Sequence, residues 1–537
     1  MIRIHEIKLK AGENESRLPG KVERRLGLPK GSVRGVRIVK ESLDAREKPD
    51  IYRVFSLDVE SDLPDHTLLL AARNKKVKAA EVSDKPYVFP EQTRELKHRP
   101  VVVGFGPCGI FAALTLARYG LSPIIIERGA MMERRIEAVE EFWKLGKLDP
   151  NANVQFGEGG AGTFSDGKLT TGTKDAAQRI VLEAFVDAGA SPAILYRQKP
   201  HIGTDVIRRA VVELRSKLLD QGARFRFNTV MKSVEIEDGA VKGITVCSDG
   251  KEEFIKTDTV ILALGHSARD SFAMLWDKGL KMEQKQFSMG VRIEHPQKMT
   301  DMAQYGALSS DLGIGPADYK LAVRTAEGRG VYTFCMCPGG YVVASASGEG
   351  QVVTNGMSES LRDGENSNSA LLVDVLTSDF GGEDPLAGVR FQEKYEHLAF
   401  EAGGSCYKAP AQRVGDFLGA NISAPCGGPE PSYRPGVNWT ELDRCLPDFV
   451  AASIREALPL LDRKLHGFAA PDAVMTAIES RSSSPVRMRR DISGCALDSA
   501  GNPIYGLFPA GEGAGYAGGI MSSAVDGIHA AEHAVTV

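Results

Sequence analysis

Residues 101–129, VVVGFGPCGIFAALTLARYGLSPIIIERG, are the stretch from which the rest of the sequence is best understood. Val101–Val103 is apolar and β-branched, which is typical of a parallel strand buried on both faces. Gly104, Gly106 and Gly109 then form a G-x-G-x-x-G turn. The first glycine permits a tight bend, the second lets the backbone approach a pyrophosphate, and the third lets the following helix pack on its strand.

The residues after this turn complete a strand–helix–strand unit. A helix is predicted over residues 110–119, and its uncharged start leaves backbone N–H groups free to face an anion. A second strand is predicted over residues 123–126. Glu127 follows it, where a carboxylate would accept hydrogen bonds from an adenosine ribose. The unit therefore predicts a dinucleotide site, without distinguishing NAD from FAD.

The composition is ordinary for a soluble protein of several domains. The chain has 537 residues, of which 42% are hydrophobic and 25% charged, and its formal net charge is -4. This balance argues against a dedicated nucleic-acid-binding protein. The polar N-terminus and the lack of a long apolar run predict neither a signal peptide nor a membrane span. The eight cysteines lack C-x-x-C spacing, so no disulfide framework and no metal site are predicted, and we expect a cytoplasmic protein.

The first hundred residues have the pattern of a small, separate α+β domain. Strands are predicted over residues 2–9, 33–39 and 51–59, with a helical apolar stripe over residues 18–28. A charged, proline-containing linker is expected over residues 84–100. Residues 1–99 hold 22 Lys and Arg against 16 Asp and Glu. This excess fits an anionic partner such as RNA, or a solvated surface, and the interleaved acids favour the surface.

A second glycine cluster lies in residues 154–169, VQFGEGGAGTFSDGKL. It is too rich in glycine for a helix and follows no convincing strand. We interpret it as a loop whose backbone approaches a phosphate or a flavin ring, with Ser165, Asp166 and Lys168 nearby. The alternative is a glycine-rich connection beneath a domain interface.

Two further features belong to the same nucleotide-binding pattern. Residues 223–228, 230–237 and 241–246 resemble a short β-meander of the kind that interrupts such domains. Residues 260–264 form another apolar strand that ends at Gly265, with His266 next. A small residue at the carboxyl end of a buried strand lets the chain pass beside a cofactor.

Residues from about 270 to 470 lack the α/β alternation and are interpreted as an inserted, strand-rich domain. Within it, Cys335 and Cys337 form a C-x-C pair, for which two ordinary thiols are favoured over a redox-active pair. Beyond it, residues 481–491 bring four arginines together. Their guanidinium groups suit an anionic substrate, and a salt-bridged turn is the equal alternative.

The C-terminal segment carries the second cofactor signature. A strand is predicted over residues 507–510, followed by the glycine cluster Gly511-Glu512-Gly513 and a helix starting near Gly519. A carboxylate at Glu512 can accept a hydrogen bond from a ribityl hydroxyl. The N-terminus of the helix offers positive potential to the pyrimidine end of a flavin. Together with the first glycine turn, this cluster makes FAD the expected cofactor.

The combination resembles the glutathione-reductase-type flavoproteins. The whole chain, including FGEGGAGTFSDGKL, VVTNGMSESLRDGENSNSALLV and RSSSPVRMRRD, resembles the bacterial FAD-dependent dehydrogenase family of unassigned substrate. The resemblance implies that Val230 lies near the adenine, Gly265 beside the cofactor, Glu512 at the ribityl chain and residues 518–520 under the flavin. No second βαβ glycine fingerprint is found, so a dedicated NAD(P)H domain is not predicted, although NAD(P)H could serve as a transient electron donor.

These expectations define the candidate residues and domains. The candidate cofactor-binding residues are Gly104, Gly106, Pro107, Cys108, Gly109, Glu127, Arg128, Gly160, Gly162, Ser165, Lys168, Val230, Ala263, Gly265, Gly511, Glu512, Gly518, Gly519 and Ile520. The candidate catalytic residues are His266, Lys168 and Asp166. The expected α/β architecture has an N-terminal α+β domain (1–97), a Rossmann-like FAD-binding domain from both ends of the core (98–270 and 470–537), and an inserted α+β substrate domain (271–469).

The predicted function is that of an FAD-dependent oxidoreductase. It would pass a hydride between a small, anionic or neutral, substrate and flavin N5, with the substrate held under the inserted domain. Two alternatives stay open: a flavin-bearing RNA-binding or RNA-modifying protein, and a flavoprotein that passes electrons to a partner protein. Of these, the nucleic-acid partner is disfavoured because the basic excess is modest and lacks aromatic interleaving.

Overall fold

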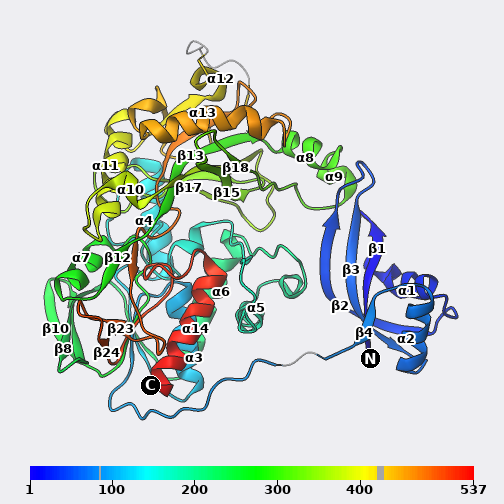
Figure 1. Ribbon diagram of the computed structural model, residues 1–537, viewed down its shortest axis with the longest axis horizontal. Coiled ribbons are helices and arrows are strands. Elements are labelled where there is room, and N and C mark those ends of the chain that lie inside the picture. Colours follow the sequence, from blue (N-terminus) through cyan, green and yellow to red (C-terminus); the bar gives the residue numbers. More distant parts are fainter. Residues whose placement is uncertain (84–85, 420–427) are drawn as a thin grey trace.

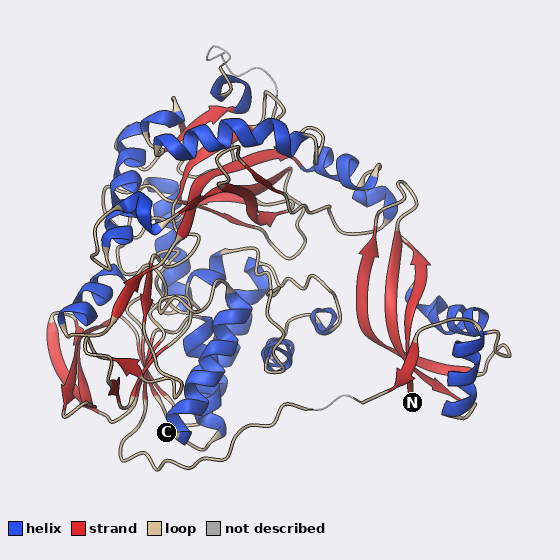
Figure 2. Ribbon diagram, viewed as in Figure 1, coloured by secondary structure: helices blue, strands red, loops and turns tan. Residues whose placement is uncertain are grey.

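The computed structural model describes residues 1–83, 86–419 and 428–537. Cys426 and the first two residues of the expected linker, 84–85, lie outside the described residues. The protein is a mixed α/β structure that contains both parallel and antiparallel sheets (Figure 2). Among the described residues, no helix is long and apolar enough to cross a membrane.

The N-terminal residues form a four-stranded sheet of order β2-β3-β1-β4. Its elements are β1 (Ile2–Lys10), α1 (Leu18–Leu26), β2 (Val33–Asp44), β3 (Tyr52–Ser61), α2 (Asp65–Asn74) and β4 (Ala79–Glu81). Alternate side chains of β1, among them Ile2 and Ile4, pack in one apolar cluster with Leu26 and Leu68 of the helices. The three predicted strands and the predicted helix are therefore present. This unit stands to one side of the body and is joined to it by an extended segment (Figure 1).

A five-stranded parallel sheet of order β25-β11-β5-β6-β7 forms the centre of the body. Its strands are β5 (Val101–Val103), β6 (Ile124–Ile126), β7 (Arg224–Arg226), β11 (Val260–Leu262) and β25 (Leu507–Pro509). Strands from both ends of the core thus pair directly, with β5 between β11 and β6. The buried, β-branched residues of β5 explain its central place.

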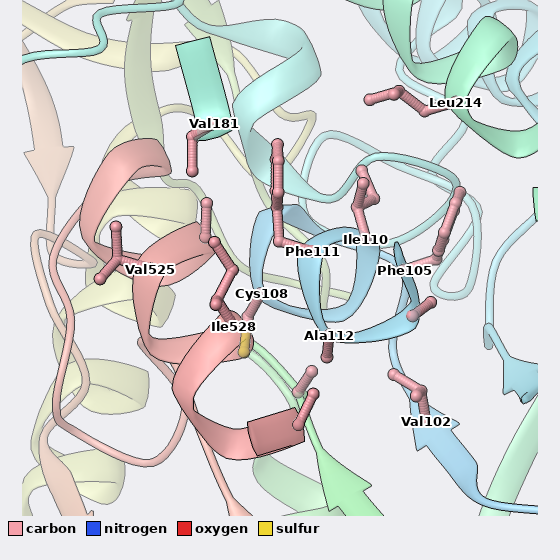
Figure 3. Packing of buried hydrophobic residues seen from close by; sticks show 14 of the residues in the cluster. Val102, Phe105, Cys108, Ile110, Phe111, Ala112, Val181, Leu214, Val525 and Ile528 are labelled. Carbon is pink, nitrogen blue, oxygen red and sulfur yellow. The ribbon is translucent and has the colours of Figure 1, made fainter. Parts of the chain in front are cut away.

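Two helices from opposite ends of the core pack tightly beside this sheet. They are α3 (Pro107–Arg118) and α14 (Ile520–Thr536). A Cβ at Gly527 of α14 would lie 2.1 Å from the carbonyl oxygen of Cys108, so only glycine permits this approach. Phe111 and Ile528 point into the shared apolar cluster (Figure 3). This packing holds the C-terminal helix against the first glycine turn.

The β-meander differs from the prediction in one strand. Residues 224–226 form β7, which continues the parallel sheet beside β6. The meander itself consists of β8 (Thr229–Glu237), β9 (Ala240–Ser248) and β10 (Lys251–Lys256). The expected first strand was misplaced because the alternating pattern of residues 223–228 suits either a parallel edge strand or a hairpin strand.

A seven-stranded sheet of order β14-β15-β18-β13-β21-β19-β20 forms the second large layer. Its strands are β13 (Phe287–Pro296), β14 (Ala322–Arg324), β15 (Gly330–Cys337), β18 (Asn366–Val375), β19 (Ala409–Arg413), β20 (Val437–Trp439) and β21 (Val474–Glu479). The sheet includes β21, although we expected residues from 470 onward to belong with the nucleotide-binding part. Because β21 is buried throughout and pairs with both β13 and β19, this boundary was placed too early.

The remaining elements cover these sheets or connect them. The helices are α4 (Met132–Leu145), η2 (Ala161–Phe164), α5 (Gln178–Asp187), α6 (Thr204–Asp220), α7 (Arg269–Asp277), α8 (Gln297–Tyr305), α9 (Ser309–Leu312), α10 (Thr377–Phe380), α11 (Ala387–Ala402), α12 (Val414–Phe417) and α13 (Asp448–Asp462). The short strands are β12 (Met282–Gln284), β16 (Tyr341–Ala344), β17 (Thr354–Met357), β22 (Val486–Met488), β23 (Ala496–Leu497) and β24 (Pro503–Ile504). Helices α11 and α13 lie on the outside of the seven-stranded sheet (Figure 1).

Candidate functional site

A cavity of about 560 Å³ lies between the parallel sheet and the seven-stranded sheet. Most candidate residues from distant parts of the sequence meet on its wall. Those that line it are Gly104, Gly106, Pro107, Cys108, Glu127, Arg128, Gly160, Gly162, Ser165, Lys168, Ala263, Gly265, His266, Glu512, Gly518, Gly519 and Ile520. Gly109, Asp166, Val230 and Gly511 do not. The structure thus gathers both glycine clusters and the C-terminal signature at one site.

The first glycine turn is shaped by close backbone contacts. Gly104 has φ +101°, and a Cβ on it would lie 2.2 Å from the carbonyl oxygen of Ala263. A Cβ on Gly109 would lie 1.9 Å from the carbonyl oxygen of Gly104, which accounts for the third glycine although it lies outside the cavity. A Cβ on Gly160 would lie 2.9 Å from Gly106 Cα. The second glycine cluster therefore closes directly over the first.

The N-terminus of α3 and the carboxylate of Glu127 form the innermost part of this wall. Within the described residues, no side chain caps α3, and its first turn has no acidic residue. Its backbone N–H groups are therefore free to bind an anion. Glu127 accepts backbone N–H groups of Phe105, Gly129 and Gly157, each at 2.9 Å. Because a carboxylate offers about four acceptor positions, one is left toward the cavity.

Arg135 organises the glycine-rich loop, and the sequence interpretation missed it. Its side chain is fully buried and donates to the carbonyl oxygens of Asn153, Val154 and Glu158 and to Thr163 Oγ1. Burial lowers the pKa of Arg135 to about 9. The sequence feature that could have identified Arg135 is its place as a single arginine within the apolar stripe of α4, between Met132 and Phe142.

The C-terminal signature lines the same cavity beside the second glycine cluster, since a Cβ on Gly162 would lie 3.1 Å from Ile520 Cγ1. Gly518 and Gly519 are exposed and line the cavity, and a Cβ on either would meet no atom of the described residues within 4 Å. Helix α14 begins at Ile520 with no side-chain cap among the described residues and no acidic residue in its first turn. Burial raises the pKa of Glu512 to about 7, although Lys285 acts in the opposite direction. Gly511 lies behind this wall, where its N–H donates to Asp526.

Val230 and Asp166 lie outside the cavity for different reasons. Thr229 and Met231 of β8 line the cavity, while Val230 sits between them in the strand and its side chain takes the other face. Asp166 is fully buried and bound by Arg362, whose Nε lies 3.0 Å from Asp166 Oδ1, and by the Ser358 hydroxyl. A carboxylate held in this way positions Arg362 and lacks direct access to a ligand.

His266 lines the cavity, but its surroundings keep the imidazole neutral. Burial, with Arg481 and Arg269, lowers the pKa of His266 to about 3. Its Nδ1 lies 2.9 Å from Ser267 Oγ. A group with so low a pKa is a poor proton acceptor at neutral pH.

Arg481 is fully engaged by the protein. Its Nε and Nη2 bind both carboxylate oxygens of Glu396, Nη1 donates to Ser267 and Ser347, and Nη2 also donates to Gln351. All five N–H groups therefore have partners. Glu396, which lies on α11 and also binds Arg269, was not identified from the sequence, because two helical turns of ordinary amphipathic pattern surround it.

The other three arginines of residues 481–491 are also held within the protein. Arg487 donates to the carbonyl oxygen of Gly515, Arg489 to Glu283, and Arg490 to Asp526. The four arginines thus form the salt-bridged, hydrogen-bonded turn that was the alternative to an anion-binding cluster.

The wall contributed by the seven-stranded sheet carries polar groups that the sequence did not single out as a site. Lys168 lines the cavity together with Cys335, Thr354, Asn355 and Arg362, and its Nζ lies 3.9 Å from Asp166 Oδ2. Thr354 Oγ1 is buried and has no hydrogen-bond partner among the described residues. The cavity therefore has a basic, partly unpaired polar end, distinct from the glycine-lined end.

Comparisons with known proteins identify relatives of this chain. An uncharacterised protein of Clostridium beijerinckii is 45% identical over 535 residues, which cover 99% of this chain and 98% of that protein. Residues 286–482 match the family model described as FAD-dependent protein, C-terminal domain-like. Residues 1–60 match a domain of unknown function.

Solved structures that align with this chain include a flavin-dependent brominase and a steroid dehydrogenase. A flavin-dependent brominase triple mutant aligns with TM-score 0.36 and 12% identity, covering 81% of this chain and 79% of that one. A 3-ketosteroid dehydrogenase from Rhodococcus jostii aligns with TM-score 0.34 and 13% identity, covering 83% and 99%. TM-scores this low carry no conclusion about the fold or chemistry of this chain.

Proposed function

The chain belongs to the bacterial FAD-dependent dehydrogenase family of unassigned substrate, and from that premise we propose that it is an FAD-dependent oxidoreductase that transfers a hydride between a small substrate and flavin N5. The observation that carries this proposal is the single cavity shared by the first glycine turn, the second glycine cluster and the N-terminus of α14. These parts lie up to four hundred residues apart in sequence, and each has the chemistry of a different part of FAD.

The proposed placement assigns each end of the cavity to one part of the cofactor. The uncapped N-terminus of α3 binds the pyrophosphate, and the free acceptor position of Glu127 binds a ribose hydroxyl. Gly518 and Gly519 leave room for the flavin ring at the N-terminus of α14. Helix N–H groups at that position favour negative charge at the pyrimidine end of the ring. Val230 and Gly265 keep their proposed places near the adenine and the ring, Val230 through its backbone.

The chemistry of the bound flavin would be two-electron transfer at N5, and the protein's own residues supply orientation and polarity. Glu512, with a pKa near neutrality, is proposed to hold or release a proton at the ribityl hydroxyl it binds. Lys168 is the proposed cationic contact for the substrate, because it faces the cavity whereas Asp166 is tied to Arg362 and His266 stays neutral. Strands β15 and β21 of the seven-stranded sheet line the substrate side of the cavity.

The sequence has no second glycine fingerprint, so no separate domain for an NAD(P)H electron donor is expected. We propose that NAD(P)H, if it is the donor, binds transiently at the same cavity. Anaerobic mixing of the purified protein with NADH and with NADPH tests this step, because bleaching of the visible flavin bands reports reduction directly. Absence of bleaching with both would exclude them as donors without affecting the assignment of FAD.

The visible absorption spectrum of the full-length protein is the deciding experiment for the cofactor. We expect a yellow protein whose chromophore is released on denaturation and elutes with FAD rather than FMN. Purified protein that is colourless and binds no added FAD, measured by quenching of the flavin's fluorescence, would overturn the proposed function.

A further inference from the structure

Cys335 and Cys337 come together at an irregularity in β15. The pairing of β15 with β18 runs from Phe334 to Cys337 through a register shift. Cys335 has φ +43°, in the left-handed region that non-glycine residues rarely adopt. Within this irregularity, Cys337 Sγ donates to the carbonyl oxygen of Cys335 at 3.2 Å. Both are free thiols in this structure.

Arg292 holds this unusual backbone in place. Its fully buried guanidinium donates through Nη1 to the carbonyl oxygen of Cys335 at 2.9 Å. The same side chain donates to Asn368, Asn355 and both carboxylate oxygens of Glu479. All five N–H groups are thus used, so the strand is fixed around Cys335 from one side.

The two sulfurs differ in access and in charge. Cys335 lines the cavity, whereas Cys337 is fully buried behind it. The hydrogen bond with Cys337, together with the positive charges of Lys168 and Arg292, lowers the pKa of Cys335, against burial and the charge of Asp166. The pKa of Cys337 is raised by the same pairing and by burial. One thiol therefore lines the cavity and has a lowered pKa, and its neighbour two residues along is buried.

We propose that Cys335 and Cys337 form a redox-active pair that accepts a small disulfide in the cavity, with Cys335 as the attacking residue and Cys337 as the resolving residue. The C-x-C spacing, the distorted strand and the shared cavity carry this assignment. It replaces the interpretation of the two residues as ordinary thiols that the sequence alone favoured.

The proposed reaction is thiol–disulfide exchange. The Cys335 thiolate attacks one sulfur of a disulfide R–S–S–R, so a Cys335–S–S–R bond forms, the R–S–S–R bond breaks and RS⁻ leaves. The Cys337 sulfur then attacks Cys335 Sγ, the mixed disulfide breaks, and the second R–S group leaves with the Cys337 proton as RSH. The pair loses two electrons and the disulfide gains them.

The same cavity holds the residues assigned to the flavin. Electron exchange between the cysteine pair and the flavin rests on the proposed function. Exchange between the pair and a small disulfide does not depend on it. The two can therefore fail separately: a protein without flavin would still be expected to oxidise its thiols with a disulfide.

Mass spectrometry of the full-length protein tests the pair, with hydroxyethyl disulfide as the probe. Cleavage after Arg329 and Arg362 yields one peptide, residues 330–362, that holds Cys335 and Cys337 and no other cysteine. After incubation with the probe and alkylation, we expect this peptide to be unalkylated and lighter by two hydrogen atoms than the reduced peptide. Dithiothreitol should restore two alkylated thiols.

The exposed Cys406, in a different peptide, serves as an internal control because it should form a mixed disulfide with the same probe. If Cys406 carries the adduct while residues 330–362 keep two free thiols, the proposal is overturned. The order of attack is tested by Cys337→Ser, which should trap the probe's adduct on Cys335. In Cys335→Ser, Cys337 should stay unmodified, and equal modification of Cys337 would overturn its role as the buried, resolving thiol. Cys406→Ser should leave the oxidation of the pair unchanged.

Discussion

Arg135 occupies the space that a side chain at residue 157 would need, since a Cβ on Gly157 would lie 2.4 Å from Arg135 Cδ. Gly157 also has φ +120°, so the loop is shaped for glycine by its backbone as well as by this contact. The glycine-rich loop is thus wrapped around one buried guanidinium. The N–H of Gly157 in turn donates to Glu127, which ties this arrangement to the first glycine turn.

Replacing Arg135 with Met should therefore unfold the loop locally and weaken the cofactor site. The variant leaves four buried acceptors without a donor, and we expect a loss of roughly 3 kcal/mol in the free energy of unfolding. Urea denaturation followed by circular dichroism measures the loss, and the flavin-to-protein ratio after purification should fall with it. The matched control is Arg134→Met, because Arg134 is exposed and its ion pair among the described residues is with Glu137 at the surface. An equal effect of both substitutions would contradict the scaffold role.

The parts of this site that the sequence predicted are those set by local rules. Gly104 and Gly109 were identified because a tight turn into a helix needs glycine at both positions, whatever surrounds it. Glu127 was expected directly after the second strand, and it follows β6 and lines the cavity. Its three backbone partners were not foreseen, because Phe105 and Gly157 reach it only through the folding of separate loops.

The parts that were missed depend on contacts between distant segments. Asp166 appeared as a catalytic candidate because it lies in the glycine-rich loop expected to face the flavin, yet Arg362, almost two hundred residues away, engages its carboxylate. The arginines of residues 481–491 suggested anion binding because they lie close together in the sequence, and Glu396 of α11 binds Arg481. Neither partner can be found from periodicity, since the pairing is fixed by how the two sheets meet.

The proposed position of the flavin predicts that a side chain at residue 518 interferes with FAD binding. In the part of the chain that the structure describes, a Cβ there meets no atom within 4 Å, so Gly518→Leu should fold normally and project into the cavity. We expect an unchanged unfolding midpoint for the apoprotein and at least a tenfold loss of FAD affinity, about 1.4 kcal/mol. Titration of each apoprotein with FAD, followed by flavin fluorescence, measures the affinity.

Gly315→Leu is the matched control for that variant. Gly315 is likewise exposed, a Cβ on it would meet no atom within 4 Å, and it lies outside the cavity lining. FAD binding by Gly315→Leu should equal that of the parent protein. Normal FAD affinity in Gly518→Leu would move the flavin away from the N-terminus of α14.

Glu396 should be needed for stability because it compensates two buried arginines. Arg269 and Arg481 both bind its carboxylate, and these positive charges lower its pKa despite burial. Glu396→Gln leaves Arg481 without its counter-charge and Arg269 with only the more distant carboxylate of Glu393, for which we expect a loss of about 3–5 kcal/mol in the free energy of unfolding. In the parent protein this contribution is present above the pKa of an unfolded glutamate, and it is lost as pH falls toward the lowered folded pKa.

Glu393→Gln provides the comparison, because Glu393 lies one turn earlier on α11 and contacts Arg269 only from the surface at 3.6 Å. Chemical denaturation at neutral pH should separate the two variants clearly. A loss of less than about 1 kcal/mol for Glu396→Gln would show that the arginines are satisfied without the charge.

His529 should make the attachment of the extended segment before β5 sensitive to pH. Its Nδ1 lies 2.9 Å from Glu532 and its Nε2 2.9 Å from Asp175, while the Tyr87 hydroxyl donates to Glu532. The hydrogen bond to Glu532, with the one to Asp175, raises the pKa of His529 to about 9 against burial. Because the folded pKa is raised, the stability from this cluster is fully present below about pH 6.5 and is lost as pH rises through 9.

The measurement compares the parent protein with His529→Gln at pH 6.5 and at pH 9.5. The parent should be the more stable of the two at pH 6.5, and the difference in their free energies of unfolding should shrink at pH 9.5. Limited proteolysis within residues 86–99 should follow the same trend, since Tyr87 anchors that segment to α14 through Glu532. A difference between the two proteins that is constant across this range would mean that His529 is neutral in the folded state, and the cluster would then be an ordinary hydrogen-bond network.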